Sequence, residues 1–243
     1  MNISEVANEL APNGVLRAGV NLANPLLVTG EAANGDPQGI SPDMGAEIAR
    51  RMGTDVRYVT YSTPGEVADG GARGEWDIAM IAADPKRAET LAFTPAYVEI
   101  EATYLVRGDS PVQKIDDVDR PGTRIAVSSR SAYDLWLSRN LKHAELVRGE
   151  GLKGTFEMFA ASDLDVLAGL RPALRENAIA LKDSRILDGC YMTVQQAVAT
   201  RPDCPAGLAF LNAYVAEVTA SGFVAGLIEK HGVEGKLQVA VAR

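Results

Sequence analysis

The sequence is poor in the residues on which many catalytic and metal sites depend. It has two histidines and two cysteines among 243 residues, and aromatic residues make up 6% of it. It contains no GxSxG, GxxxxGK[ST] or HExxH motif. The histidines, His143 and His231, follow predicted helix ends, so we expect them at the surface or as helix caps. We therefore expect no metal and no other cofactor, although an enzyme that uses only carboxylates stays open.

Basic residues and long apolar runs are also scarce. The 24 Lys and Arg residues against 32 Asp and Glu residues give a net charge of −8, which disfavours nucleic-acid binding. The longest apolar stretch, residues 18–30, includes Asn21, Asn24 and Pro25, so it is too short and too polar to span a bilayer. With 47% hydrophobic and 23% charged residues, the composition is typical of a globular protein of one large or two small domains.

The cysteines and the amino terminus give little information about compartment. Cys190 and Cys204 could pair, but a disulfide needs closely matched positions, so we expect two free thiols while pairing stays open. The first ten residues contain Glu5 and Glu9 and lack the basic and apolar regions of a secretory signal. Either a signal was removed and a methionine placed on the mature chain, or the natural protein stays in the cytoplasm.

Short apolar runs alternate with capped helical stretches, a pattern that predicts an α/β protein. The predicted helices begin at Ser41-Pro42, Thr63-Pro64, Asp84-Pro85 and Ser131, and two more follow residue 200 with a break at Ser221-Gly222. The predicted strands cover residues 15–20, 56–60, 77–82, 102–106, 124–128, 146–148, 164–168, 185–187 and 191–200. A cluster of helix- and strand-breaking residues at 107–111 and the extended segment at 191–200 suggest two lobes with a ligand cleft between them.

Several runs of the sequence resemble the family 3 bacterial solute-binding proteins, the polar amino-acid receptors of ABC transporters. The resemblance covers nearly the whole chain in the expected order. It is carried by residues 14–20 (GVLRAGV), 39–53 (GISPDMGAEIARRMG), 74–79 (GEWDIA), 84–88 (DPKRA), 93–97 (FTPAY), 115–118 (IDDV) and 221–232 (SGFVAGLIEKHG).

The resemblance implies a type II periplasmic-binding-protein fold, in which two α/β lobes are joined by two crossing segments. Lobe one would comprise residues 1–107 and 192–243, and lobe two residues 108–191. It also implies a small-molecule ligand, a periplasmic location, an ABC-transporter membrane component as partner, and a monomer.

The resemblance also implies an anion-binding site. Arg87 resembles the arginine that holds the ligand carboxylate, for which a bidentate guanidinium is well suited. Pairing of Arg87 with Asp84 or Glu89 is the alternative. Ser128, Ser129 and Ser131 match the strand-to-helix loop that presents N–H groups and hydroxyls to the same carboxylate, and Ser131 could equally be a plain helix cap.

Two departures from the family pattern concern the ligand. Around Ala82 the family carries hydroxyl donors, whereas this chain offers backbone groups alone. The run from Asp165 ends at Leu170 where the family has the aspartate that binds the α-ammonium, and Arg171 follows it. A buried ammonium without a carboxylate partner is costly. We therefore expect a ligand with a carboxylate and neutral polar groups, and a second anionic group if Arg171 faces inward.

Further ligand contacts are expected from polar and aromatic side chains in the same regions. Asn21 and Asn24 could contact the ligand or form a turn beside Pro25. Tyr133 or Trp136 could line the cleft, although aromatic residues on a helix more often belong to the core. At most one of Gln195 and Gln196 can face the cleft, because strand side chains alternate.

A non-catalytic receptor is the function favoured by these observations. An enzyme similar to the cyclohexadienyl dehydratases, on the same fold, is the alternative, and Glu99 and Glu101 would be its candidate acids. Glutamates at such positions are more often ordinary solvated charges or charges near the hinge. A cytoplasmic ligand sensor is a third reading.

Overall fold

The computed structural model describes residues 2–241 and divides the chain into two compact units. Unit 1 contains the residues up to Glu99 and those from Gln195 onward, and unit 2 is Ile100–Val194. Two long strands, β6 (Ala92–Arg107) and β11 (Met192–Thr200), run from one unit into the other. The breaker cluster at residues 107–111 follows β6 and does not interrupt it, so this strand is much longer than the predicted 102–106.

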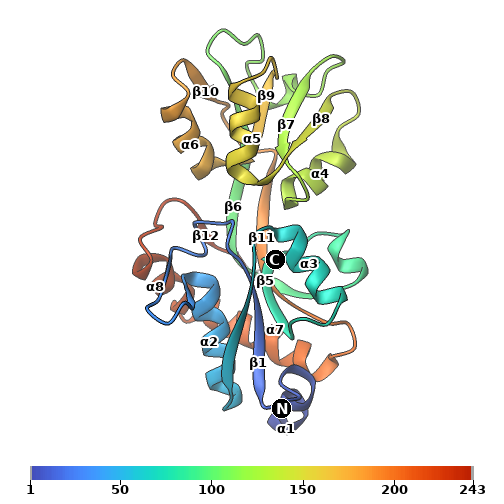
Figure 1. Cartoon of the computed structure of the whole chain (residues 1–243), viewed down its shortest axis with the longest axis vertical. Coiled ribbons are helices and arrows are strands. Elements are labelled where there is room, and N and C mark those ends of the chain that lie inside the picture. Colours follow the sequence, from blue (N-terminus) through green and yellow to red (C-terminus); the bar gives the residue numbers. More distant parts are fainter. Residues whose placement is uncertain (1, 242–243) are drawn as a thin grey trace. The chain divides into compact units, whose positions relative to one another are not determined.

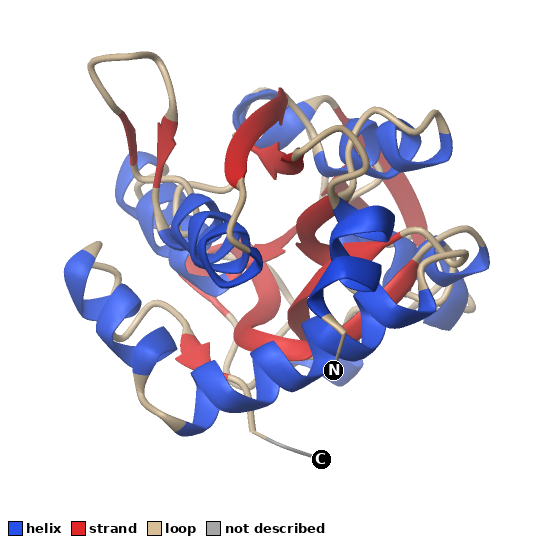
Figure 2. Ribbon diagram, turned by 90° about the horizontal axis from the view of Figure 1, so that it is seen from below, coloured by secondary structure: helices blue, strands red, loops and turns tan. Residues whose placement is uncertain are grey.

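Unit 1 has a mixed sheet flanked by helices (Figures 1 and 2). β1 pairs in parallel with β4 and β5, β5 pairs antiparallel with β11, and β12 pairs with β6. A separate hairpin joins β2 and β3. The strands are β1 (Val15–Asn21), β2 (Gly30–Glu31), β3 (Pro37–Gln38), β4 (Asp55–Tyr61), β5 (Ile78–Ala82) and β12 (Gln238–Val239). The helices are α1 (Ile3–Leu10), α2 (Ile40–Met52), α3 (Pro64–Ala72), α7 (Pro205–Ala220) and α8 (Phe223–Lys230).

Unit 2 is built on three parallel strands. β7 lies between β8 and β9, and β9 pairs antiparallel with β6, which also pairs with β10. Each parallel strand leads into a helix, and α5 lies over β9 and β7 (Figure 1). The elements are β7 (Arg124–Ser128), α4 (Ala132–Asn140), β8 (Glu145–Gly149), α5 (Gly151–Ala160), β9 (Val166–Leu170), α6 (Arg171–Ala180) and β10 (Ser184–Ile186). Within residues 2–241 no single helix is long and apolar enough to cross a bilayer, whereas α7 and α8, bent by 69° at their break, qualify only as a pair.

Each unit has its own hydrophobic core. In unit 1, Trp76 is fully buried, and its Nε1 donates a hydrogen bond to the Val67 carbonyl at 2.8 Å. Its partners are Val67, Ala79, Ile81, Leu91 and Ala199. In unit 2, the core under α5 and α6 consists of Leu105, Ala126, Phe159, Leu164, Leu167 and Leu174.

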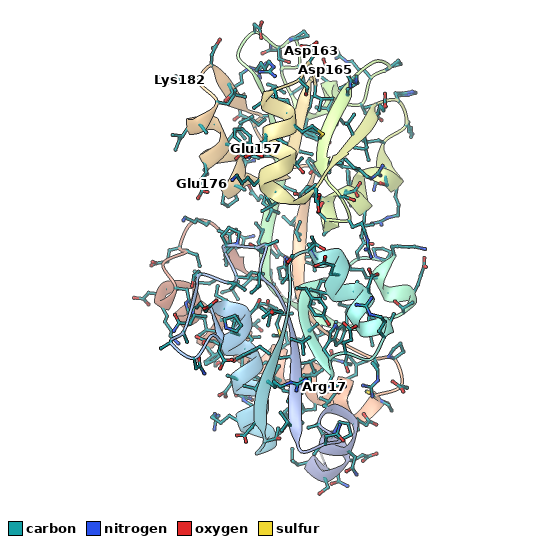
Figure 3. All side chains as sticks on the ribbon, in the orientation of Figure 1. Arg17, Glu157, Asp163, Asp165, Glu176 and Lys182 are labelled. Carbon is teal, nitrogen blue, oxygen red and sulfur yellow. The ribbon has the colours of Figure 1, made fainter. Side chains whose placement is uncertain are left out.

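The polar side of unit 1 includes a buried ion pair at the start of the sheet. Arg17, on β1 (Figure 3), donates from Nη2 to the fully buried Asp77 carboxylate at 2.7 Å, and Arg201 approaches the same carboxylate at 3.6 Å. The buried charge is therefore paired, as a buried carboxylate must be to avoid a large desolvation cost.

Two predicted helix starts are wrong. The residue that caps α2 is Gly39, whereas Ser41 lies inside the helix and its hydroxyl contacts the Tyr97 hydroxyl at 3.2 Å. Asp84-Pro85 leads into a single 3₁₀ turn, Arg87–Glu89, and no α-helix forms there. The caps at Thr63 and Ser131 are confirmed, because each side chain accepts the N–H three residues on.

Gly39 has a backbone conformation that other residues rarely adopt, with φ at 147°. A Cβ placed there would lie 2.2 Å from the Leu27 carbonyl oxygen. Gly39→Ala is therefore expected to lower the free energy of unfolding by about 2 kcal/mol or more, measured by urea denaturation. Gly53→Ala is the control, since Gly53 also has positive φ but nothing lies near its Cβ position. Equal losses in the two variants would contradict the steric argument.

Glu47, on α2, makes unit 1 sensitive to acid. The hydrogen bond from Arg50 at 2.6 Å, aided by Arg51 and opposed by partial burial, lowers the pKa of Glu47 from its usual 4.5 to about 2. A lowered folded-state pKa gives stability that is present above pH 4.5 and is lost as pH falls towards 2. Glu47→Gln should remove this part of the acid dependence, which unfolding curves at pH 7, 4 and 2.5 would measure. A variant with the same pH profile as the parent would refute the assignment.

Candidate functional site

In unit 1, the candidate residues gather at the carboxyl ends of parallel strands, where ligands of α/β proteins commonly bind. Asn21 is the last residue of β1 and Ala82 the last of β5. The side-chain oxygen of Asn21 accepts the Ala23 N–H at 3.1 Å, and that of the buried Asn24 accepts the Leu26 N–H at 3.1 Å. Both asparagines therefore form the turn that the sequence left open, and their amide N–H groups are the donors that could reach a ligand.

Arg87 is held at the same end of β5. The residue is 5% exposed, and its Nη1 donates to the Ala82 carbonyl oxygen at 2.7 Å. The short 3₁₀ turn positions it, and Asp84 fixes the start of that turn by accepting the Lys86 N–H at 2.8 Å. Glu89 bonds to Lys86 at 2.7 Å. A buried, oriented guanidinium of this kind is suited to a carboxylate.

The two adjacent glutamines on β11 lie beside the carboxyl end of β5. The Ala83 N–H donates to the Gln195 carbonyl at 2.8 Å, and Gln196 lies opposite Ala82 in the sheet. Gln196 is buried, with 6% of its surface exposed, whereas Gln195 is half-buried. Because neighbouring strand residues point to opposite faces, the two side chains cannot serve one site together.

In unit 2, the serine loop, defined as residues 128–131, connects β7 to α4. Its backbone N–H groups are largely used inside the protein. The Ser129 N–H donates to Gly149 O at 2.9 Å, the Arg130 N–H to Asp134 Oδ2 at 2.8 Å, and the Ser131 N–H to Ser128 O at 3.2 Å. The N–H groups in the first turn of a helix have no hydrogen-bond acceptor within that helix. Anion binding here would therefore depend on the serine hydroxyls and on the N–H groups in the first turn of α4.

Asp134 is a site residue that the sequence reasoning missed. It is 3% exposed in the first turn of α4 and accepts hydrogen bonds from the Arg130 N–H and from Arg148 Nε at 3.0 Å. Arg148 offsets the negative charge that Asp134 brings close to the serine loop. The pattern Ser131-x-x-Asp134 is a known helix-start signature, and would have pointed to this residue.

Tyr133 is buried beside the serine loop. Its side chain is 4% exposed, and its hydroxyl bonds to Ser131 and Ser128; burial raises its pKa to about 12, so it is a neutral hydrogen-bonding group. Trp136 instead packs against Tyr191, with ring centroids 5.4 Å apart, and Tyr191 stacks on Tyr104 at 4.4 Å. Trp136 therefore belongs to an aromatic cluster.

The end of β9 carries the departure from the family pattern. Leu170 is buried, and the next side chain, Arg171, donates to Glu101 Oε2 at 2.5 Å and also bonds to the Gly189 carbonyl. Glu101 is close because Ala102 pairs with Leu170 across the sheet. The charge of Arg171 is thus offset by Glu101 within unit 2, and a second anionic group on the ligand stays a prediction.

The remaining chemically versatile residues are Glu99, the two histidines and the two cysteines. Glu99 is 5% exposed and accepts from Gln238 at 3.3 Å. His231 ends α8 and contacts Asp43 at 2.8 Å, whereas His143 is exposed. Both cysteines are free, Cys190 exposed and Cys204 buried. Among residues 2–241, no three histidine, cysteine, aspartate or glutamate side chains are grouped as metal ligands.

Comparison with solved structures shows the fold. The P235GK mutant of ArgBP from T. maritima superimposes with a TM-score of 0.75 at 23% identity, over 94% of this chain and 100% of that one. AbpA from Streptococcus pneumoniae, bound to L-arginine, gives 0.74 at 16% identity, over 91% and 96%. The ancestral amino acid-binding protein AncCDT-1, a precursor of cyclohexadienyl dehydratase, gives 0.72 at 21% identity, over 92% and 97%. No curated protein sequence matches the chain.

These similarities define an α/β protein with the fold of the two-lobed periplasmic binding proteins, as the sequence predicted. The family model for bacterial extracellular solute-binding proteins, family 3, matches residues 16–234. The chain therefore belongs to that family, and it is a solute-binding protein.

Proposed function

We propose that the protein is a non-catalytic receptor for a small ligand that bears a carboxylate, either an amino acid or a related organic acid. The observation that carries the proposal is Arg87, a buried guanidinium oriented by Ala82 O at the carboxyl end of β5. In unit 2, the hydroxyls of Ser128, Ser129 and Ser131 and the first turn of α4 are the proposed anion-binding groups. Asn21, Asn24 and Gln195 would contact neutral polar parts of the ligand.

Similar proteins support amino-acid binding. AbpA is bound to L-arginine, and a putative binding component of an ABC transporter from Wolinella succinogenes is complexed with lysine, at 20% identity and a TM-score of 0.73 over 92% of this chain and 98% of that one. Membership of an extracellular solute-binding family supports a periplasmic protein that delivers its ligand to an ABC importer. We propose further that the protein is a monomer. Fractionation of the native organism tests the location, and recovery of unchanged ligand after long incubation tests the absence of catalysis.

A thermal-shift screen of the purified protein tests the carboxylate proposal. The common amino acids would be compared with dicarboxylates, hydroxy acids and aromatic acids, because a ligand that binds only the folded state raises the melting temperature. We expect shifts with one or more carboxylates, and none with the corresponding amides or alcohols. Equal shifts with carboxylates and their amides, or no shift with any acid, would overturn the proposal.

A further inference from the structure

Unit 2 contains a small cavity directly beside the serine loop. Its volume is about 20 Å³, and one side is formed by Ser128, the first residue of the loop, and by Tyr133, in the first turn of α4. The other lining residues come from β9, α5 and α6, and are Leu152, Thr155, Leu167, Ala168, Gly169, Ala173, Leu174 and Asn177.

The cavity exists because small residues meet where the parallel strands end. Ala126 pairs with Leu167 across β7 and β9, so Ser128 and Gly169, two residues further along, lie on the same sheet face. This is the face covered by α5 and α6, since Ala126 and Leu167 pack there with Phe159 and Leu174. Gly169 lets the Leu174 side chain pack close to β9, since a Cβ there would come within 3.0 Å of it.

The lining of the cavity is neutral. Its polar side chains are Ser128, Tyr133, Thr155 and Asn177, and the Thr155 hydroxyl already donates to Gly151 O at 2.5 Å. The acidic residues of the two covering helices, Glu157 and Glu176 (Figure 3), are exposed and are not among the lining residues. An ammonium or a carboxylate in this cavity would lack a charged partner and would pay a large desolvation cost. A neutral hydroxyl can instead bond to the Ser128 and Asn177 side chains.

The size of the cavity restricts the group that can enter. A space of about 10–15 Å³ is the minimum for one water molecule, so the cavity admits a single hydroxyl or a group of similar size. A long side chain does not fit. The geometry points to a subsite for a hydroxyl group next to the ligand carboxylate, so the preferred ligand is a 2-hydroxy acid. This inference rests on the proposed function, because it requires the carboxylate to lie on the serine loop.

Ligands that differ in one group test the subsite. Isothermal titration would compare 2-hydroxy-4-methylpentanoate, 4-methylpentanoate and leucine, each chiral compound as both enantiomers, and then lactate, propionate and alanine. One enantiomer of the hydroxy acid should bind at least about tenfold more tightly than both of its analogues, because sites that hydrogen-bond a hydroxyl discriminate strongly against ligands that lack it. Equal binding of the hydroxy and deoxy acids, or tighter binding of the amino acids, would overturn the subsite and leave the carboxylate receptor standing.

A variant that fills the cavity gives a second, independent test of the hydroxyl subsite. Ala173→Ser should abolish the preference for the hydroxy acid and leave the affinity for 4-methylpentanoate within about twofold, since the added oxygen is about the size of the one hydroxyl that the cavity admits. Ala180→Ser is the matched control, because Ala180 is exposed at the other end of α6 and should change neither affinity. A preserved preference in folded Ala173→Ser would overturn the subsite. Should that variant fail to fold, titration of the unmodified protein with the ligand series alone tests the subsite. If no acid binds the unmodified protein, both the proposed function and the subsite are overturned.

Discussion

Arg87→Ala is expected to weaken binding of the best carboxylate by about 30-fold or more, equivalent to about 2 kcal/mol. Arg87 is buried, with 5% of the residue exposed, so a carboxylate that its guanidinium binds is removed from water and depends on the positive charge. Titration calorimetry on the purified variant would measure the loss, with the ligand that gives the largest thermal shift in the unmodified protein.

Two controls separate binding from folding in this experiment. Arg87→Lys keeps the charge but loses the planar fork and the geometry of the bond to Ala82 O, so its affinity should fall between those of the parent and the alanine variant. Arg50→Ala removes a guanidinium from the surface, where 70% of its side chain is exposed, and should leave the affinity unchanged. A folded Arg87→Ala variant that binds as tightly as the parent would remove Arg87 from the site.

Trp76→Ala should cause the largest loss of stability, about 4 kcal/mol. The indole is fully buried, and it loses both its packing and its hydrogen bond to Val67 O. The surroundings cannot collapse onto the space easily, because the indole packs directly on Gly19 and Gly71, where added Cβ atoms would come within 2.9 and 2.4 Å of it.

Trp136→Ala provides the comparison for the same side-chain change. Trp136 is only partly buried, on the aromatic cluster of unit 2, so its loss should cost less than half as much. Urea unfolding followed by far-ultraviolet circular dichroism would measure both variants. Equal costs would show that the packing around Trp76 does not account for its contribution.

The features predicted correctly from the sequence are those that depend on neighbouring residues. Thr63 and Ser131 were identified as caps because a capping side chain bonds to an N–H three positions away. Ser41 and Asp84 are residue types that are equally suited to cap a helix, but tertiary contacts determine that neither caps an α-helix here. Ser41 bonds to the distant Tyr97, and the chain after Asp84 makes one 3₁₀ turn before β6 begins.

The ligand-binding features depend more on contacts between distant residues. The pairing of Arg171 with Glu101 spans 70 positions and follows from the register of β6 and β9, which the sequence does not reveal. The cavity beside Ser128 likewise is lined by residues, Gly169 and Ala173 among them, that only the packing of α6 on β9 brings together. Arg87 was found through the family resemblance, whereas its burial and its bond to Ala82 O come from the fold.

The division of the chain into units has a consequence for its synthesis. Unit 2 is one continuous segment, Ile100–Val194, whereas unit 1 is made of two segments separated by it. As the chain leaves the ribosome, unit 2 has all of its residues once Val194 has emerged, because domains fold as units when their residues are available. At that moment β5, in which every residue is buried in the finished protein, still lacks its partner β11, and α1 lacks α7. The second unit in the sequence is thus the first that can fold, and the apolar edge of β5 needs protection until the last segment is made.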